Sequence, residues 1–152
     1  MGLDATGIFN ALISHAEATG LFESVNGCEP KSSPGKGITA AVWVARIEPA
    51  RAASGLAATS VVVACTVRIF SDMLQEPQDG IDPAVLEATD ALMNAYSGDF
   101  TLGGLIRSVD LLGQTRNPLF AQSGYINVNG RMFRIMDITV PMIVNDVWEQ
   151  EA

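Results

Sequence analysis

Histidine, cysteine and charge are all scarce in this sequence of 152 residues. His15 is its one histidine, and Cys28 and Cys65 are its two cysteines. A single imidazole and two isolated thiols do not supply a clustered metal site, and they leave no base for a Ser/His/Asp arrangement. Two thiols also make no disulfide scaffold, so we expect both to be free, as in a reducing compartment. The sequence therefore predicts no metal, no cofactor and no enzyme.

Cations are few as well. Lys and Arg total 9 against 17 Asp and Glu, and the formal net charge is -8. Tight binding to a phosphate backbone needs clustered Lys and Arg, which this chain does not have. An acidic surface would instead repel a nucleic acid duplex and let it slide past. The sequence therefore predicts no sequence-specific binding to DNA, although DNA can pass close by.

Long apolar runs are absent too. No stretch reaches the roughly 18 apolar residues of a membrane-spanning helix, so no membrane partner is expected. The segment 1–20 has polar residues inside it and lacks a basic start, which predicts a helix and not a signal peptide. Charged residues make up 17% of the chain, against about 25% in typical soluble domains. Low charge without a membrane span indicates that part of the surface is buried against other protein.

Two amphipathic helices are predicted in a single domain that spans residues 1–152. The first covers 4–18, with Asp4 as the N-cap and Gly20 just past the end, and His15 lies at the margin of its apolar stripe. The second begins at Asp82 and ends at Gly98. Its expected apolar stripe consists of Val85, Leu86, Thr89, Leu92, Met93 and Tyr96.

Alternating and continuous apolar runs predict the strands. Residues 38–48 and 61–70 form one antiparallel pair, joined by a small-residue segment, 49–60. This segment is expected to protrude as an arm, either one that reaches a neighbouring subunit or a merely flexible loop. A further strand is expected over 105–112. Pro141 is expected to place the last strand at an edge or end of the sheet, because proline has no N–H for a ladder.

The clearest element is a hairpin over 123–146, closed by Asn129-Gly130. Such a two-residue loop favours a type I′ turn and fixes the register of the two strands. One face then carries Ile126, Val128, Phe133 and Ile135, and the other carries Tyr125, Arg134, Asn127, Met132 and Met136. Neither face has the composition of an ordinary solvated surface.

Together these elements predict an α+β fold with a mostly antiparallel sheet of about five strands and both helices packed on one face. Apolar residues occur on both parities of the strands, so the second face is left without a cover from the chain itself. Such a face is expected to meet another subunit, and symmetric repetition of that contact makes a ring.

The order of elements resembles that of the tail terminator, or tail completion, proteins of long-tailed bacteriophages. The resemblance covers nearly the whole chain, and it is carried mainly by YSGDFTLGGLIRSVDLLG (96–113) and GYINVNGRMFRIMDITVPMIVNDVW (124–148). It implies a virion protein that forms a hexameric ring on the head-proximal end of the tail tube. The implied ring stops tube polymerisation, meets the tube protein and a neck or head-completion protein, and lets DNA pass through its lumen.

Carried onto this sequence, the resemblance implies that the sheet edges and the arm at 51–59 contact neighbouring subunits or the tube. The expected interface residues are Trp43, Arg51, Leu56, Tyr125, Met132, Arg134 and Met136. Acidic residues such as Asp99 and Asp110 are expected to line the lumen, since a negatively charged wall repels a passing duplex.

Two other functions stay open at this point. One is another head–tail connector or a tail tube component, which would stack into tubes instead of closing a terminal ring. The other is a small oligomeric enzyme or ligand-binding domain that uses a cleft beside Tyr125 and Arg134.

Overall fold

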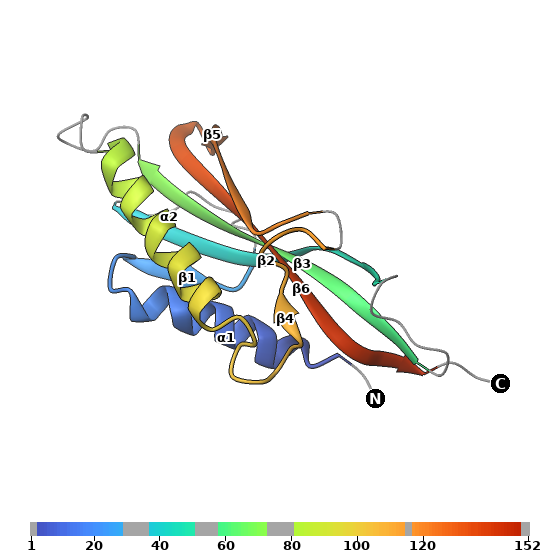
Figure 1. The fold of residues 1–152 in the computed structure, drawn as a ribbon. Coiled ribbons are helices and arrows are strands. Elements are labelled where there is room, and N and C mark those ends of the chain that lie inside the picture. Colours follow the sequence, from blue (N-terminus) through green and yellow to red (C-terminus); the bar gives the residue numbers. More distant parts are fainter. Residues whose placement is uncertain (1–2, 29–36, 51–57, 73–80, 115–116, 150–152) are drawn as a thin grey trace.

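A computed structural model describes residues 3–28, 37–50, 58–72, 81–114 and 117–149. Within these ranges the chain forms two helices and six strands (Figure 1). In chain order they are α1 (Ala5–Ala18), β1 (Ser24–Asn26), β2 (Ile38–Pro49), β3 (Ala58–Asp72), α2 (Ile81–Gly98), β4 (Ser108–Val109), β5 (Phe120–Val128) and β6 (Arg131–Glu149). The predicted α+β class is confirmed.

The strands form one mixed, mostly antiparallel sheet in the order β1-β2-β3-β6-β4, and β5 also pairs with β6. Only β1 and β2 run parallel. The long strands β3 and β6 pair from Ala58–Glu149 to Asp72–Phe133. They continue past the helices as an extension of the sheet toward the lower right of Figure 1.

Both helices pack on one side of the sheet, which we call the helix face (Figure 1). The alternate residues of β3 and β6 that point to this side join one large core with the apolar stripes of α1 and α2. Its members from the two strands include Val63, Cys65, Val67, Ile69, Ile138, Val140 and Met142. The alternation predicted for 61–70 is therefore confirmed.

The helix ends follow the expected local chemistry. The Asp4 carboxylate accepts a hydrogen bond from the Gly7 backbone N–H at 3.0 Å, which satisfies a donor that the first helical turn leaves unpaired. Gly20 follows α1 with φ of 70°, a backbone conformation that glycine adopts without a Cβ clash. In α2, Leu86 is 63% exposed, so its assignment to the buried stripe is wrong, while Val85, Thr89, Leu92 and Tyr96 are buried.

The opposite side of the sheet, which we call the far face, has a small core of its own. Phe70 of β3 and Phe133 of β6 pack there with Ala41 and Ile135. Trp43, Ile126 and Val128 lie around them, partly buried. The predicted hairpin register is confirmed at every pair from Val128–Arg131 to Gly124–Ile135. The prediction that the chain leaves the far face without cover is wrong in this region, because the residues of its own hairpin fill it.

Two strand predictions are corrected. The segment predicted as a strand over 105–112 is mostly turn, and only Ser108–Val109 pair with β6. Pro141 does not mark an edge, because β6 has β3 on one side and β4 and β5 on the other. The Pro141 carbonyl accepts from the Asp110 N–H at 2.8 Å, on the β4 side. The N–H and C=O of a strand residue point the same way, so the N–H that proline lacks is not one that β3 needs.

Candidate assembly surface

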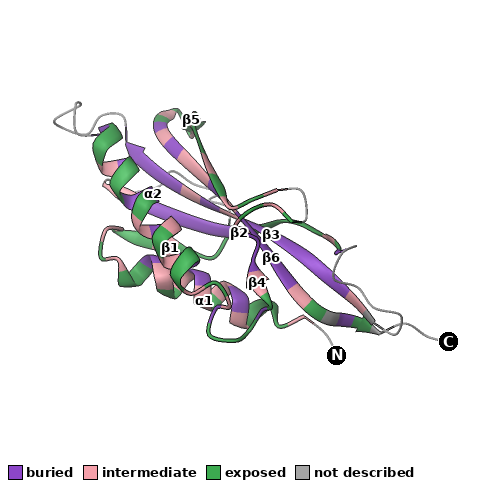
Figure 2. Cartoon of the chain, viewed as in Figure 1, coloured by how far each residue is buried: buried purple, intermediate pink, exposed green. Residues whose placement is uncertain are grey.

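The sheet carries most of the large apolar side chains that remain exposed in the described part of the chain. On the sheet these are Val44, Ile47, Phe120, Tyr125, Met132 and Trp148; elsewhere they are Leu86, Phe100, Leu105 and Leu112. Figure 2 shows exposed residues on the hairpin strands as well as on the helices. Val44 and Ile47 lie in β2 and Phe120 and Tyr125 in β5, at opposite borders of the sheet. Both borders therefore offer apolar surface.

Tyr125 and Arg134 lie opposite each other on the helix face of the hairpin. The guanidinium carbon of Arg134 is 4.6 Å from the centroid of the Tyr125 ring. The Nε of Arg134 donates a hydrogen bond to Oδ1 of Asp82 at 3.0 Å. The Tyr125 ring stays 60% exposed. Arg134 thus ties the hairpin to the start of α2 and holds the tyrosine in place, and these two predicted interface residues meet.

Trp43, another of the predicted interface residues, lies on the far face. The Arg68 guanidinium carbon is 5.2 Å from the centroid of its ring. Arg68 also donates two hydrogen bonds to the Asp137 carboxylate, from Nε at 2.6 Å and from a terminal nitrogen at 3.0 Å. Such a bidentate pair is stronger and more directional than a single ionic contact.

A groove of about 550 Å³ lies over this ion pair. Trp43 and Phe120 are its aromatic walls, and it is lined neither by Tyr125 nor by Arg134, so it is not the cleft expected beside those two residues. Sequence reasoning did not identify Arg68 or Asp137. The available signal was a lone arginine in the apolar run VVVACTVRIF, which needs a buried partner on a neighbouring strand.

The methionines of the hairpin have different environments. Met132 is 46% exposed, whereas Met136 is partly buried and packs against the helix-face core. Met136 therefore supports the fold of the chain itself, and it is a weaker interface candidate than Met132. Arg51 and Leu56, the remaining predicted interface residues, lie outside the described residues.

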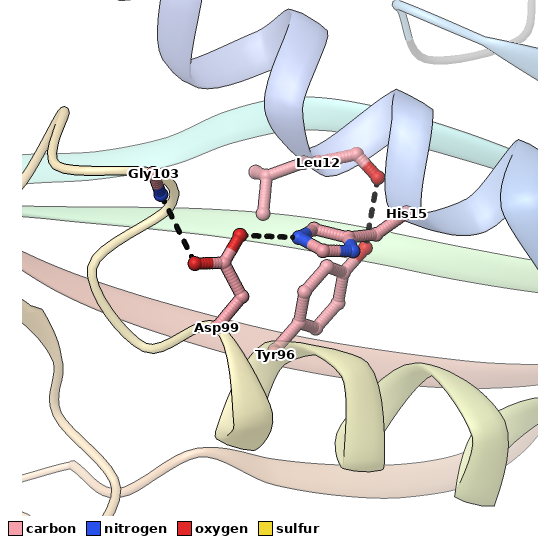
Figure 3. A network of polar contacts seen from close by, with 5 residues as sticks. All are labelled: Leu12, His15, Tyr96, Asp99 and Gly103. Atoms are coloured by element: carbon pink, nitrogen blue, oxygen red, sulfur yellow. Dashed lines mark hydrogen bonds and ion pairs between the residues drawn. The ribbon is translucent and has the colours of Figure 1, made fainter.

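Asp99 follows α2 and joins three parts of the chain (Figure 3). Its two carboxylate oxygens contact His15 Nε2 at 2.9 Å and the Gly103 N–H at 3.0 Å. The hydrogen bond from Gly103 and then that from His15 lower the pKa of Asp99, because both stabilise the carboxylate. His15 also meets the Tyr96 ring edge to face, with centroids 5.9 Å apart. The Tyr96 hydroxyl donates to the Leu12 carbonyl, and burial raises the pKa of this phenol. This network joins α1 to the end of α2.

Asp110 does not fit the predicted lumen role. It is 3% exposed, and its Oδ1 accepts hydrogen bonds from the backbone N–H groups of Gly113 and Gln114 at 3.0 and 2.8 Å. An Asp side chain that accepts from N–H groups a few residues on stabilises a turn. The expectation for Asp110 is therefore wrong, and its carboxylate holds the segment between β4 and β5.

The described residues contain no group of three or more His, Cys, Asp or Glu side chains placed to hold a metal ion. Cys28 is exposed and Cys65 is buried, and both are free. Burial raises the pKa of Cys65 to about 12, because it disfavours the thiolate. Neither described helix has the length and apolar character to span a bilayer.

No family model and no curated protein matches the chain. Among solved structures, it is similar to a chain of the sheath/tube terminator, in its extended state, of the extracellular contractile injection system PVC, at 10% identity and a TM-score of 0.45. That alignment covers 100% of this chain and 62% of the other, so this chain spans less than two thirds of its length. It is also similar to a chain from the virion of a native gene transfer agent particle, at 12% identity and a TM-score of 0.39, covering 89% and 92% of the two chains. At these values the likenesses carry no functional assignment.

Proposed function

We propose that this chain is a structural subunit of a phage tail or tail-like particle and acts as one domain over residues 1–152. Copies of it form a closed ring at the head-proximal end of the tail tube. The resemblance to tail terminators implies six copies in this ring. The ring ends polymerisation of the tube protein and offers a docking surface to a neck or head-completion protein. Its place is the tail–neck junction of the virion.

One observation carries this proposal: four of the six exposed large apolar side chains of the sheet lie at its two borders, two at each. Val44 and Ile47 are 42% and 44% exposed on β2, and Phe120 and Tyr125 are 37% and 60% exposed on β5. A chain with two separate apolar borders can meet one neighbour on each side, which is the arrangement that a head-to-tail ring requires. Aromatic and aliphatic side chains with little charge are typical of the core of such contacts.

The residues of 96–113 and 124–148 that resemble tail terminators support the position at the tube end. The two similar solved structures are named as parts of comparable particles. Because their TM-scores are low, these two structures add no support. The proposal rests on the sequence resemblance and on the exposed apolar residues at the two borders of the sheet.

The net charge of -8 supports a lumen that DNA crosses without specific contacts. Asp99 remains the acidic candidate for its wall, because 40% of its side chain is exposed despite the contact with His15. A catalytic role finds no support in the described residues, because the Tyr96 phenol beside the His15–Asp99 pair already donates to the Leu12 carbonyl.

A second candidate function is ligand binding in the far-face groove. Its volume of about 550 Å³ falls in the usual range for small-molecule sites, about 300–1,000 Å³. Thermal melting of the protein with a library of small polar and aromatic compounds tests it. A stabilising compound whose effect disappears in Thr66→Trp, which fills the groove, while rings still form would favour this function.

Negative-stain electron microscopy and native mass spectrometry of the purified chain test the main proposal. We expect closed rings of one size that stop extension of the tube protein when added to its polymerisation reaction. Open tubes formed by this chain alone would instead favour a tube component. A monomer at high concentration would overturn the proposal.

A further inference from the structure

The outer edge of β5 carries no charge, no proline and no bulge. Its sequence FAQSGYINV pairs with β6 in an unbroken register from Phe120–Thr139 to Val128–Arg131. No other strand of the described chain pairs with β5. Natural sheets normally protect an exposed edge by charge, proline or a bulge, because its free backbone groups accept any further strand. A regular, uncharged edge is therefore a site for a strand of another chain.

The hairpin turn determines which residues present those free groups. Asn129 and Gly130 have φ of 52° and 82°, as a type I′ turn requires. In a hairpin with this two-residue loop, Val128 and Arg131 form a hydrogen-bonded pair, and every second pair after it does the same. The backbone groups of Ala121, Ser123 and Tyr125 then point away from β6. Their side chains lie on the helix face, where Ala121 packs against the large core.

The other border of the sheet has an open edge on β2, which stays regular up to Val44 and has a register shift between Val44 and Arg46. The Ile38 carbonyl accepts from the Glu23 N–H at 2.7 Å, so the backbone groups of Ile38 point outward, toward β1. By alternation those of Val42 and Val44 do too. β1 ends opposite Ala41, so neither residue has a strand partner on that side within the described ranges. The side chains of Ile38 and Val42 belong to the helix-face core, so Val44, two residues on, points to that face as well.

We infer that the β5 edge of one copy pairs with the β2 edge of the next, around Ser123 and Tyr125 on one side and Val42 and Val44 on the other. Both edges present outward backbone groups from residues whose side chains lie on the helix face. The sheet can therefore continue from copy to copy with all helices on one side.

The direction of the strands also fits this contact. β2 is antiparallel to β3, β3 to β6 and β6 to β5, so β5 runs antiparallel to β2 within one chain. A ring axis along the strands preserves their sense in every copy, so the new pair is antiparallel. It places Ser123 opposite Val44 and the exposed Tyr125 ring opposite Val42, with Val44 as its diagonal neighbour. This inference rests on the proposed ring and names its contact; pairing of β5 with a second β5 would close a two-fold dimer instead.

Ser123→Pro tests the backbone bond directly. Proline there removes an N–H that points away from β6, so the hairpin keeps its own ladder. We expect the dissociation constant of the ring contact to rise by at least about tenfold, measured by mass photometry over a dilution series. Ser123→Ala is the matched control, because it keeps the N–H, and its rings should dissociate as those of the unaltered chain do.

A charge at the same position covers the case in which Ser123→Pro does not fold. Ser123→Lys should weaken the ring as well, because lysine protects a strand edge. Asn94→Lys makes the same change of charge on the exposed side of α2 and should leave the ring intact. Rings of full stability in both Ser123→Pro and Ser123→Lys would overturn the inference.

Thiol cross-linking identifies the partner edge. The background is Cys28→Ser, which removes the exposed native thiol and leaves Cys65 buried. With a short bis-maleimide, Val44→Cys combined with Ser123→Cys should give covalent species larger than a dimer, and neither single variant should do so. Covalent dimers from Ser123→Cys alone, or intact rings without cross-links, would overturn this contact and leave the proposed ring standing. Failure of the Cys28→Ser background and of the unaltered chain to form rings would overturn the proposed function itself.

Discussion

Phe70 and Phe133 meet edge to face on the side of the sheet that the helices do not cover, with ring centroids 6.1 Å apart and an interplanar angle of 87°. Both are essentially buried. Phe70 comes from β3 and Phe133 from β6 of the hairpin, so this contact joins the hairpin to the body of the sheet on the far face. Arg131 adds an ion pair with Asp72 at the hairpin end. The far face is thus closed here by the chain itself.

Phe133→Ala should therefore act on folding and not primarily on assembly. We expect the free energy of unfolding to fall by about 3–5 kcal/mol, because the change removes a ring and leaves a cavity. Urea denaturation followed by circular dichroism measures it. Tyr125→Ala, on the other face of the same hairpin, is the control and should cost less than about 1 kcal/mol. Equal losses in the two variants would show that Phe133 does not belong to a core.

Local chemistry made much of the fold predictable from the sequence. The Asp4 cap, the span of α2 and the hairpin register all follow from contacts between residues close in the chain. Predictions failed where distant residues decide the outcome. The segment 105–112 is rich in apolar residues, yet Leu102, Gly103 and Gly104 take positive φ before it, and only Ser108–Val109 pair with β6. A buried leucine with φ of 49° has no signature in a single sequence.

The candidate surface was predictable only in part, for the same reason. The hairpin pattern placed Tyr125, Arg134 and Met132 on one face, and the structure brings Tyr125 and Arg134 together. Neither the exposure of Val44 nor the Arg68–Asp137 pair can be deduced from periodicity. Each depends on which strand lies next to which, and β6 reaches β3 across a long stretch of sequence. Asp110 shows the converse, because an acidic residue expected at the surface is buried within its own turn.

Met132 and Met136 separate assembly from folding. The free energy of unfolding of Met132→Glu should stay within about 0.5 kcal/mol of that of the unaltered chain, because Met132 is 46% exposed and belongs to neither core. Met136→Glu should lose about 1–3 kcal/mol, because it directs a carboxylate at the helix-face core. Denaturant melts of the two variants measure this difference. A weakened ring in folded Met132→Glu would add this residue to the contact surface, and a Met136→Glu protein of normal stability would contradict its place in the core.

Because of Asp99, the free energy of unfolding of the chain should depend on pH in the acidic range. The pKa of Asp99 is lowered in the folded protein by Gly103 and His15, so the stabilisation is present above the ordinary Asp pKa of about 3.9. It is lost as the pH falls through the lowered folded value. Asp99→Asn should therefore be less stable than the unaltered chain at neutral pH, and the difference should shrink once the Asp99 carboxyl group of the unaltered chain is protonated. Urea denaturation of both proteins at neutral pH and at a pH below the lowered pKa of Asp99 measures this difference. A difference in stability that does not change with pH would contradict the assignment.

The Arg68–Asp137 pair should couple in the stability of the folded chain and leave ring formation unchanged. Both side chains are largely shielded, with 16% and 31% exposed, and the contact is bidentate. A double-mutant cycle with Arg68→Ala and Asp137→Ala should give a coupling energy of about 1–2 kcal/mol, more than an exposed ion pair contributes. The pair Arg46 and Glu48 on β2, which are 3.5 Å apart and whose arginine is 49% exposed, is the matched control and should couple by less than about 0.5 kcal/mol. Equal coupling in the two cycles would mean that the groove shields its ion pair no better than open surface does.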